Sequence, residues 1–208
     1  MDGNGFKLNK MTKYILNSGG FRDKPDLAKK FFAEMVKGLG DTPHILVCCF
    51  AQAREDWETK FVTDKETVVN LFPVGVQPIL EIAFPEKFKE QVKSSDVIYI
   101  HGGDDHLVQY WLRKFDIPQI WDGKVVATSS ASSHALSKYF WTCDWREAME
   151  GLGILPIKFL AHYESSYGAH DPRGPIDWQK GYEELKVYKD SELPIYALKE
   201  GEYVIIEQ

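Results

Sequence analysis

A run of small hydroxylated residues follows a short apolar segment near the middle of the chain. Val125–Ala127 reads as a buried strand after a turn at Asp122-Gly123, and Thr128–Ser133 is rich in serine. A strand, a tight turn and a helix start are the layout of a nucleophile elbow. The first N–H groups of such a helix lack helical partners and can stabilise negative charge on a substrate oxygen. We place Ser130 at the tip, although serine and threonine are also ordinary helix caps and turn formers.

A serine hydroxyl that attacks a carbonyl carbon needs a base to take its proton. His162 directly follows the apolar run Ile154–Ala161, so it occupies a predicted strand end, as Ser130 does. The alternative interpretation of His162 is a polar residue at the surface. His134 lies one helical turn beyond Ser130 and reads more simply as part of the helix. The rim of the same site is expected to carry further histidines, in contact with substrate or merely exposed: His101, His106 and His170.

Two glycines and two aspartates follow the predicted strand Val97–Ile100. The N–H groups of Gly102 or Gly103 could help to hold an oxyanion, and a turn would need glycine equally. Asp104 and Asp105, with the histidines on either side, could bind a divalent ion. A strand, a turn and a helix capped by one of the aspartates already explain this segment, so we expect no metal. No phosphate loop or dinucleotide fingerprint is present, and no cofactor is expected.

The composition limits the possible classes of protein. The chain has 208 residues, 44% hydrophobic and 27% charged, with a net charge of −6. Nucleic-acid or membrane-surface binding is not expected, because no basic run offsets this charge. Cys48 and Cys49 lie in an apolar run and Cys143 stands alone, so no disulfide framework is predicted. No signal peptide or membrane-length apolar stretch is seen, which favours a cytoplasmic protein.

Strands and helices are expected to alternate through the first two-thirds of the chain, which predicts a three-layer α/β/α sandwich with a mainly parallel sheet. Ligands of such folds bind beyond the carboxyl ends of the strands. We expect a flexible leader over 1–10 and a single domain over 11–208. The expected strands are Lys13–Leu16, His44–Phe50, Gln77–Ile82, Val97–Ile100, Val125–Ala127 and Ile154–Ala161, with a closing β-hairpin of Ile195–Leu198 and Tyr203–Glu207 turned at Glu200-Gly201. The expected helices are Asp26–Leu39, Glu55–Phe72, Pro85–Val92, Leu107–Lys114 and Trp178–Tyr188.

Taken together, these segments resemble peptidase family S51, the dipeptidase E and cyanophycinase group of serine peptidases. The family's Gly-Gly-Asn after a strand is matched by Gly102-Gly103-Asp104, and its Gly-x-Ser-Ala-Gly elbow by Thr128–Ser132. Its strand-ending histidine is matched by His162-Tyr163, and its closing Leu-x-x-Gly by Leu198–Gly201. Both elbow glycines are replaced, and the asparagine is an aspartate. The resemblance implies a class I glutamine amidotransferase-like, flavodoxin-like sandwich.

The resemblance also implies roles for individual residues. Ser130 would be the nucleophile and His162 the base. The orienting acid would be Asp144, with Glu147 as second choice, although Asp144 could instead cap a helix. The oxyanion hole would be formed by N–H groups of Gly102, Gly103 and Ala131. Substrate contacts would come from Asp104, His134, His170 and Arg173.

The expected function is therefore a serine peptidase-like hydrolase that cleaves short peptides or small amides. The alternative is a catalytically inactive relative that binds a small molecule or partner in the same cleft, and the altered elbow favours that alternative. A glutamine amidotransferase-like enzyme would need cysteine at the elbow tip, where Ser130 stands. The protein is expected as a monomer or homodimer.

Overall fold

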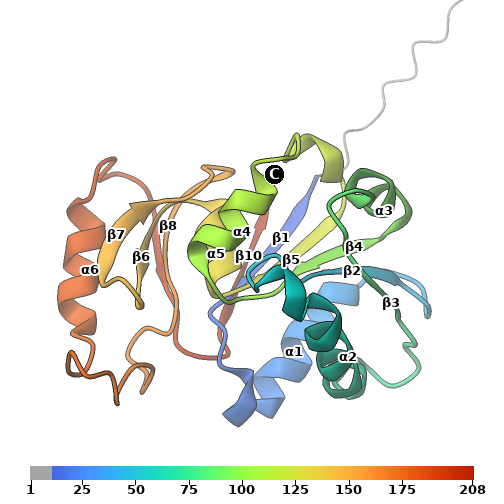
Figure 1. The fold of residues 1–208 in the computed structure, drawn as a ribbon, viewed down its shortest axis with the longest axis horizontal. Coiled ribbons are helices and arrows are strands. Elements are labelled where there is room, and N and C mark those ends of the chain that lie inside the picture. Colours follow the sequence, from blue (N-terminus) through green and yellow to red (C-terminus); the bar gives the residue numbers. More distant parts are fainter. Residues whose placement is uncertain (1–10) are drawn as a thin grey trace, which may run out of the picture.

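A six-stranded sheet forms the larger part of the molecule (Figure 1). The computed structural model describes residues 11–208. The strand order is β10-β1-β5-β4-β2-β3, and every neighbouring pair is parallel except β1 with β10. The expectation of a mainly parallel α/β fold is confirmed. The strands are β1 (Lys13–Asn17), β2 (His44–Cys48), β3 (Ile79–Ile82), β4 (Val97–Ile100), β5 (Val125–Ser129) and β10 (Tyr203–Glu207).

Helices cover both faces of this sheet. Pro25 opens α1 (Pro25–Val36), whose apolar face includes Phe31 and Phe32 packed against Tyr99 of β4. α2 (Trp57–Val68) lies on the same side, and α3 (Phe88–Ser94) lies on the other (Figure 1). Phe50, just beyond β2, packs against Phe88 of α3 and Trp111 of α4 (Asp105–Leu112). Short 3-10 turns occur at Phe21–Asp23, Arg54–Asp56, Val69–Leu71 and Gln119–Trp121.

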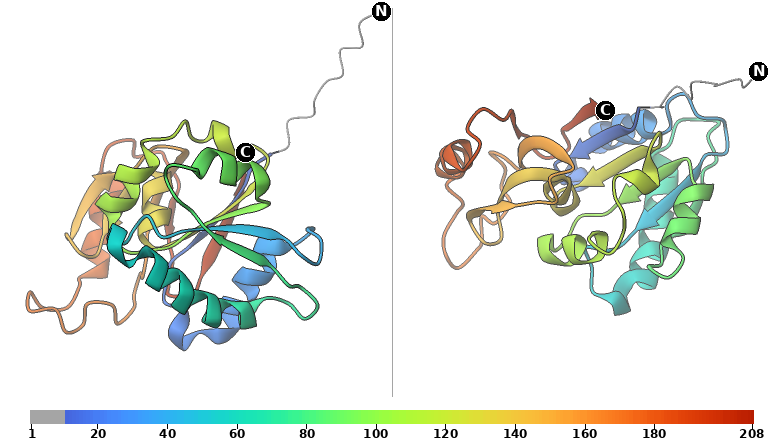
Figure 2. Two further views of the ribbon diagram at one scale, coloured as in Figure 1. Left: turned by 45° about the vertical axis from the view of Figure 1, so that its right-hand side comes forward. Right: turned by 90° about the horizontal axis from the view of Figure 1, so that it is seen from above.

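A second sheet, absent from the sequence-based prediction, follows the short helix α5 (Ala131–Leu136). Its four strands have the order β7-β6-β8-β9, and β6 begins directly after α5. With α6 (Trp178–Val187) it forms one end of the molecule (Figures 1 and 2). A separate apolar cluster that includes Trp141, Leu160 and Leu185 joins α6 to it. The strands are β6 (Ser137–Thr142), β7 (Glu147–Glu150), β8 (Leu155–Leu160) and β9 (Ile195–Ala197).

The closing hairpin predicted from the sequence is wrong. β9 pairs in parallel with β8 in the second sheet, and β10 pairs antiparallel with β1 in the first. Each strand thereby satisfies its backbone groups at a sheet edge that also offers apolar neighbours. The segment between them, which contains Glu200, therefore runs from one sheet to the other instead of closing a tight turn.

The carboxyl ends of the central strands meet at one edge of the large sheet. Asn17 at the end of β1 pairs with Ser129 at the end of β5, and Ile100 at the end of β4 pairs with Thr128. The chain leaves all three strands at this edge, which brings the segments after β1, β4 and β5 together. In α/β folds this is where ligands bind.

Candidate active site

Ser130 stands at the turn between β5 and α5 in a conformation that non-glycine residues rarely adopt. Its backbone angles are φ 51° and ψ −114°. Its N–H donates to the carbonyl of Asn17 at 2.8 Å, which ties the turn to the end of β1. The carbonyl of Ser130 accepts the N–H groups of Ser133 and His134, so the helix starts at once. A strained residue over-determined by its surroundings is typical of a functional turn.

Hydroxyl groups hold this turn where the family pattern has glycines. Ser132 Oγ donates to the carbonyl of Ile100 at 2.7 Å and accepts the N–H of Ser129 at 2.8 Å. The hydroxyls of Thr128 and Ser133 lie 2.8 Å apart, and Ser133 Oγ donates to the carbonyl of Asn17 at 2.9 Å. Both replacements are therefore accommodated without an unpaired polar group, because each added hydroxyl finds a partner in a neighbouring strand or helix.

Three polar side chains in the candidate site contact one another in series. Ser130 Oγ lies 2.9 Å from His162 Nε2, and His162 Nδ1 lies 3.2 Å from Glu200 Oε1. A neutral His162 with its proton on Nδ1 donates to Glu200 and accepts the hydroxyl proton of Ser130 on Nε2. The three residues come from the end of β5, the end of β8 and the β9–β10 connection.

The surroundings of His162 keep its ring neutral near pH 7. Only 7% of the residue is exposed. Burial lowers the pKa of His162 below its ordinary value, and a positive charge on His134 would lower it further, whereas the carboxylate of Glu200 acts in the opposite direction. A neutral imidazole with an unprotonated Nε2 is the form that can accept a proton from Ser130.

The expected contact between Asp144 and His162 is wrong. Asp144 Oδ1 accepts the hydroxyl proton of Tyr167 at 3.0 Å, while Glu200 occupies the Nδ1 side of His162. Glu147, the second choice, is exposed on β7. The sequence offered little signal for Glu200, since it lay in the turn of a supposed hairpin. Only the crossing from one sheet to the other brings residue 200 to residue 162.

Residues at the end of β1 contact the segments that carry Ser130, His162 and Glu200. Ser18 Oγ accepts the N–H of His162 at 2.6 Å and donates to the carbonyl of Leu198 at 2.9 Å. Asn17 Nδ2 donates to the carbonyl of Glu202 at 2.9 Å, beside the turn of Glu200. Gly19 packs so closely that a Cβ there would lie 2.9 Å from His162 Cε1.

The predicted oxyanion residues lie close to Ser130. A Cβ on Gly102 would sit 2.6 Å from the carbonyl oxygen of Ser129 and 3.2 Å from Ser130 Cβ, so only glycine fits there. Gly103 has φ 146°, and Gln52 Nε2 fixes the turn by donating to the carbonyl of Gly102 at 2.7 Å. The N–H of Ala131 opens α5, where helical N–H groups have no intrahelical partner.

The four predicted substrate residues differ in their surroundings. Asp104 caps α4, since its Oδ1 accepts the N–H groups of His106 and Leu107 at 2.8 and 2.7 Å. Arg173 pairs with Asp171 at 2.6 Å, and its Nη1 also donates to the carbonyl of Asp144. Arg173 is therefore not free for a substrate without breaking these bonds, whereas the cap of Asp104 uses only one of its two carboxylate oxygens. His170 is exposed in the loop before Arg173, and His134 is buried in α5.

The space beside Ser130 is small. A cavity of about 20 Å³, lined by Ser130, His134, Asp144, His162 and Tyr167 among others, lies next to the elbow. The ring of Tyr167 stacks on His162 at 4.4 Å between centroids. A larger hollow of about 310 Å³, formed by residues 166–171 with Cys143, Asp144 and Ile176, shares Asp144 and Tyr167 with it. The two spaces together offer room for a small substrate.

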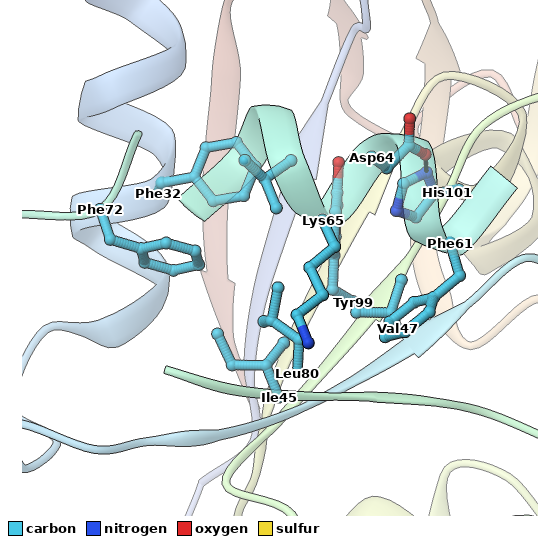
Figure 3. Close-up of a pocket in the computed structure, with 11 residues that line it drawn as sticks. Phe32, Ile45, Val47, Phe61, Asp64, Lys65, Phe72, Leu80, Tyr99 and His101 are labelled. Atoms are coloured by element: carbon cyan, nitrogen blue, oxygen red, sulfur yellow. Dashed lines mark ion pairs between the residues drawn. The ribbon is translucent and has the colours of Figure 1, made fainter. Parts of the chain in front are cut away.

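A second cavity beneath α2 is not a substrate site. It measures about 10 Å³, room for roughly one water molecule, and apolar side chains of α1, α2 and the sheet line most of it (Figure 3). At its edge His101 Nδ1 lies 3.0 Å from Asp64 Oδ2. His101 thus points toward α2 and away from Ser130.

Within residues 11–208, no three His, Cys, Asp or Glu side chains are grouped to hold a metal ion. The His101–His106 segment does not form the metal site considered from the sequence, because His101 pairs with Asp64, Asp104 caps a helix and Asp105 pairs with His134. Over the same residues, no helix has the length and apolar character to cross a bilayer.

The fold and site define an α/β protein with a serine at a strand–helix turn, hydrogen-bonded to a histidine that is paired with a carboxylate. Comparison with known proteins agrees: residues 14–208 match the model of peptidase family S51, and the chain belongs to this family. It is accordingly a peptidase-like hydrolase.

Two solved structures share the fold. A peptidase from an acI-B1 Actinobacterium aligns with a TM-score of 0.62 at 17% identity, over 95% of this chain and 84% of its own. A putative peptidase E protein from Listeria monocytogenes EGD-e aligns with a TM-score of 0.62 at 16% identity, over 95% of both chains. No curated protein matches the chain significantly.

Proposed function

We propose that this protein is a serine-type hydrolase that cleaves short peptides or small amides through Ser130, His162 and Glu200. The observation that carries the proposal is the continuous chain from Ser130 Oγ to His162 Nε2, at 2.9 Å, and from His162 Nδ1 to Glu200 Oε1, at 3.2 Å. Nucleophile, base and orienting acid are then each within reach of the next, as the chemistry requires.

In the first half of the reaction Ser130 Oγ attacks the carbonyl carbon of the substrate while His162 takes the hydroxyl proton. Glu200 stabilises the imidazolium that forms, without itself becoming protonated. The N–H of Ala131, with that of Gly102 or Gly103, would bind the oxyanion. His162 then gives its proton to the leaving amine, and the C–N bond breaks to leave an acyl-enzyme.

In the second half a water molecule takes the place of the amine. His162 removes one proton from this water as its oxygen attacks the acyl carbon. The second tetrahedral intermediate collapses, the bond to Ser130 Oγ breaks, and His162 returns the proton to Ser130. The carboxylic acid product leaves and the site is regenerated.

The substrate proposed is a short peptide or a small amide. The two solved structures with this fold, a peptidase and a putative peptidase E protein, support a peptide substrate. The limited volume beside Ser130 supports a short one. Specificity for an acidic residue is not part of the proposal, because Arg173, the candidate arginine, is already paired with Asp171.

A binding role without catalysis has one observation in its favour. The cavity beside Ser130 is about 20 Å³, and the ring of Tyr167 covers His162 within it. Catalysis therefore requires the Tyr167 ring to move aside for the substrate. Binding of a partner at the outer hollow alone requires no such movement.

The compartment proposed is the cytoplasm. Cys48, Cys49 and Cys143 are all free, buried thiols, which suits a reducing environment.

Labelling with a fluorophosphonate that reacts only with activated serines tests the proposal. The label should appear on Ser130 by peptide mass, and Ser130→Ala should abolish it. Labelling of Ser129, Ser132 or Ser133 instead would contradict the assigned nucleophile. An unlabelled, folded wild-type protein would favour the binding role.

A further inference from the structure

A second histidine–carboxylate pair lies behind the candidate site. His134 Nδ1 on α5 lies 2.9 Å from Asp105 Oδ1 on α4, and both residues are nearly fully buried, at 3% and 5% exposure. The other carboxylate oxygen, Oδ2, accepts the hydroxyl proton of Thr142 at 2.7 Å. The imidazole also stacks on Phe140 at 4.7 Å with an interplanar angle of 10°. The ring is therefore held in one place.

The hydrogen bonds of the ring determine where its proton lies. The N–H of Ala161 points at His134 Nε2 over 3.3 Å. A backbone N–H can only donate, so Nε2 accepts and carries no proton. The single proton of the neutral ring then lies on Nδ1, where Asp105 accepts it. Burial alone would raise the pKa of Asp105, but His134 and the hydrogen bond from Thr142 outweigh it and lower this pKa.

His134 contacts both chain segments that carry the Ser130–His162 pair. Its backbone N–H donates to the carbonyl of Ser130 at 3.0 Å, and its ring holds the N–H of Ala161, the residue before His162. His162 itself has φ 58°, a conformation that needs support on both sides. Ser18 supports the backbone on one side by accepting the N–H of His162. His134 supports it on the other side by accepting the N–H of Ala161.

We propose that His134, kept as the Nδ1–H tautomer by Asp105, is a positioning residue that sets the place of His162 relative to Ser130. The inference rests on the proposed function, in which His162 is the base. His134 acts through the backbone at Ala161 and takes no part in proton transfer. A shift of about 1 Å in a reacting group can cost about 100-fold in rate, so a single lost bond at Ala161 is enough to matter.

Variants of His134 test whether its hydrogen bond to the backbone of Ala161 positions His162. Gln can place its amide oxygen where Nε2 stood and accept the N–H of Ala161, whereas Asn is too short to do so. His134→Asn should lower the labelling rate of Ser130 about 100-fold. His134→Gln should recover at least 10-fold of this loss.

The matched control is His44→Gln. His44 also pairs with a carboxylate, Glu81, at 2.9 Å and lies 3.1 Å from a backbone carbonyl, but it sits at the opposite end of β2 from the site. His44→Gln should leave the labelling rate unchanged. Equal rates for His134→Gln and His134→Asn would overturn the proposal.

A readout that does not depend on activity completes the test. Amide hydrogen exchange of Ala161, followed by NMR, should be slow in the wild type and in His134→Gln and at least 10-fold faster in His134→Asn. Fast exchange in the wild type, or equal protection in both variants, would refute the bond to His134. If wild-type Ser130 is not labelled at all, the proposed function fails, and the exchange data still decide whether His134 holds the backbone before His162.

Discussion

Two residues of the candidate site are held in left-handed conformations that glycine usually adopts. Ser130 has φ 51° and His162 has φ 58°. Each costs ~1–3 kcal/mol, which the surrounding contacts must offset. Asn17 and Ser18 supply part of this support, since the carbonyl of Asn17 accepts the N–H of Ser130 and the hydroxyl of Ser18 accepts the N–H of His162. The two strained residues are thus fixed by neighbours in a third segment.

At the scale of single residues, the variant Glu200→Gln tests whether Glu200 or Asp144 is the acid that orients His162. The amide cannot stabilise the imidazolium as the carboxylate does, so hydrolysis or fluorophosphonate labelling should fall by ~10³-fold or more. Asp144→Asn should cost less than ~10-fold, because Asp144 contacts Tyr167 and not His162. The rates of both variants, measured relative to wild type, decide which of the two acids has this role. A larger loss in Asp144→Asn would return the role to that residue.

The same variant has a predicted pH signature. Burial lowers the pKa of His162 below its ordinary value, so the acidic limb of the wild-type activity should lie at lower pH than for an ordinary histidine. The negative charge of Glu200 raises this pKa, and its removal should move the limb of residual activity further down in pH. A limb that moves to higher pH would show that Glu200 does not act on His162.

Gly19→Ala tests the close packing of the segment after β1. A Cβ there would meet His162 Cε1 at 2.9 Å and Ser130 Cβ at 3.2 Å, so the pair should be pushed apart and activity lost by about 100-fold or more. Gly38→Ala is the control, since Gly38 has a similar φ, 81° against 86°, with nothing near its Cβ. Both should lose about 1 kcal/mol of stability, and only Gly19→Ala should lose activity. Equal activity in the two would refute the packing argument.

At the scale of elements, α6 is attached to the second sheet by a buried lysine. Lys158 on β8 is fully buried, and its Nζ donates to the carbonyls of Leu185 and Lys186, both at 2.9 Å. Both carbonyls belong to the last turn of α6, where that of Leu185 also accepts the N–H of Tyr188 at 3.3 Å. A positive charge there also complements the negative end of the helix dipole.

Lys158→Met should therefore lower the free energy of unfolding by about 2 kcal/mol, because two carbonyls in the last turn of α6 lose the ammonium group that donates to them. Urea unfolding measures this loss. Lys180→Met on the exposed side of α6 serves as the control and should change stability by less than 0.5 kcal/mol, roughly the effect of an ordinary surface substitution. A stability gain in Lys158→Met would mean that the cost of burying the charge exceeds the value of its bonds.

At the scale of the whole molecule, the site exists only where the two sheets meet. Ser130 comes from the six-stranded sheet, His162 from the four-stranded sheet, and Glu200 from the segment that joins them. α5 contacts strands of both sheets and lies between them. Disturbance of the sheet–sheet contact should therefore affect activity before it unfolds either sheet.

The enclosed position of Ser130 predicts small substrates. Dipeptides and tripeptides should be cleaved, and casein should not, because a cavity of about 20 Å³ beside a hollow of about 310 Å³ admits only a few residues. Parallel assays at equal enzyme concentration make the comparison. Efficient casein cleavage with little dipeptide turnover would contradict the small cleft.

Much of the fold and part of the site follow from short stretches of sequence. Apolar runs of three to six residues mark the strands β2, β4 and β5, and the amphipathic face of α1 marks its helix. The turn at Ser130 is local as well, since strand, tip and helix start lie within a dozen residues. The position of His162 at a strand end is also visible in the chain.

Other features depend on contacts between distant residues, and no local pattern contains them. β9 and β10 are close in sequence but join different sheets, because each finds an open edge there. Glu200 reaches His162 across 38 residues of chain only because its segment crosses between the sheets. Asp144, the local candidate, is turned instead toward Tyr167. A local pattern specifies which residues could react, whereas strand pairing between remote segments decides which side chains meet.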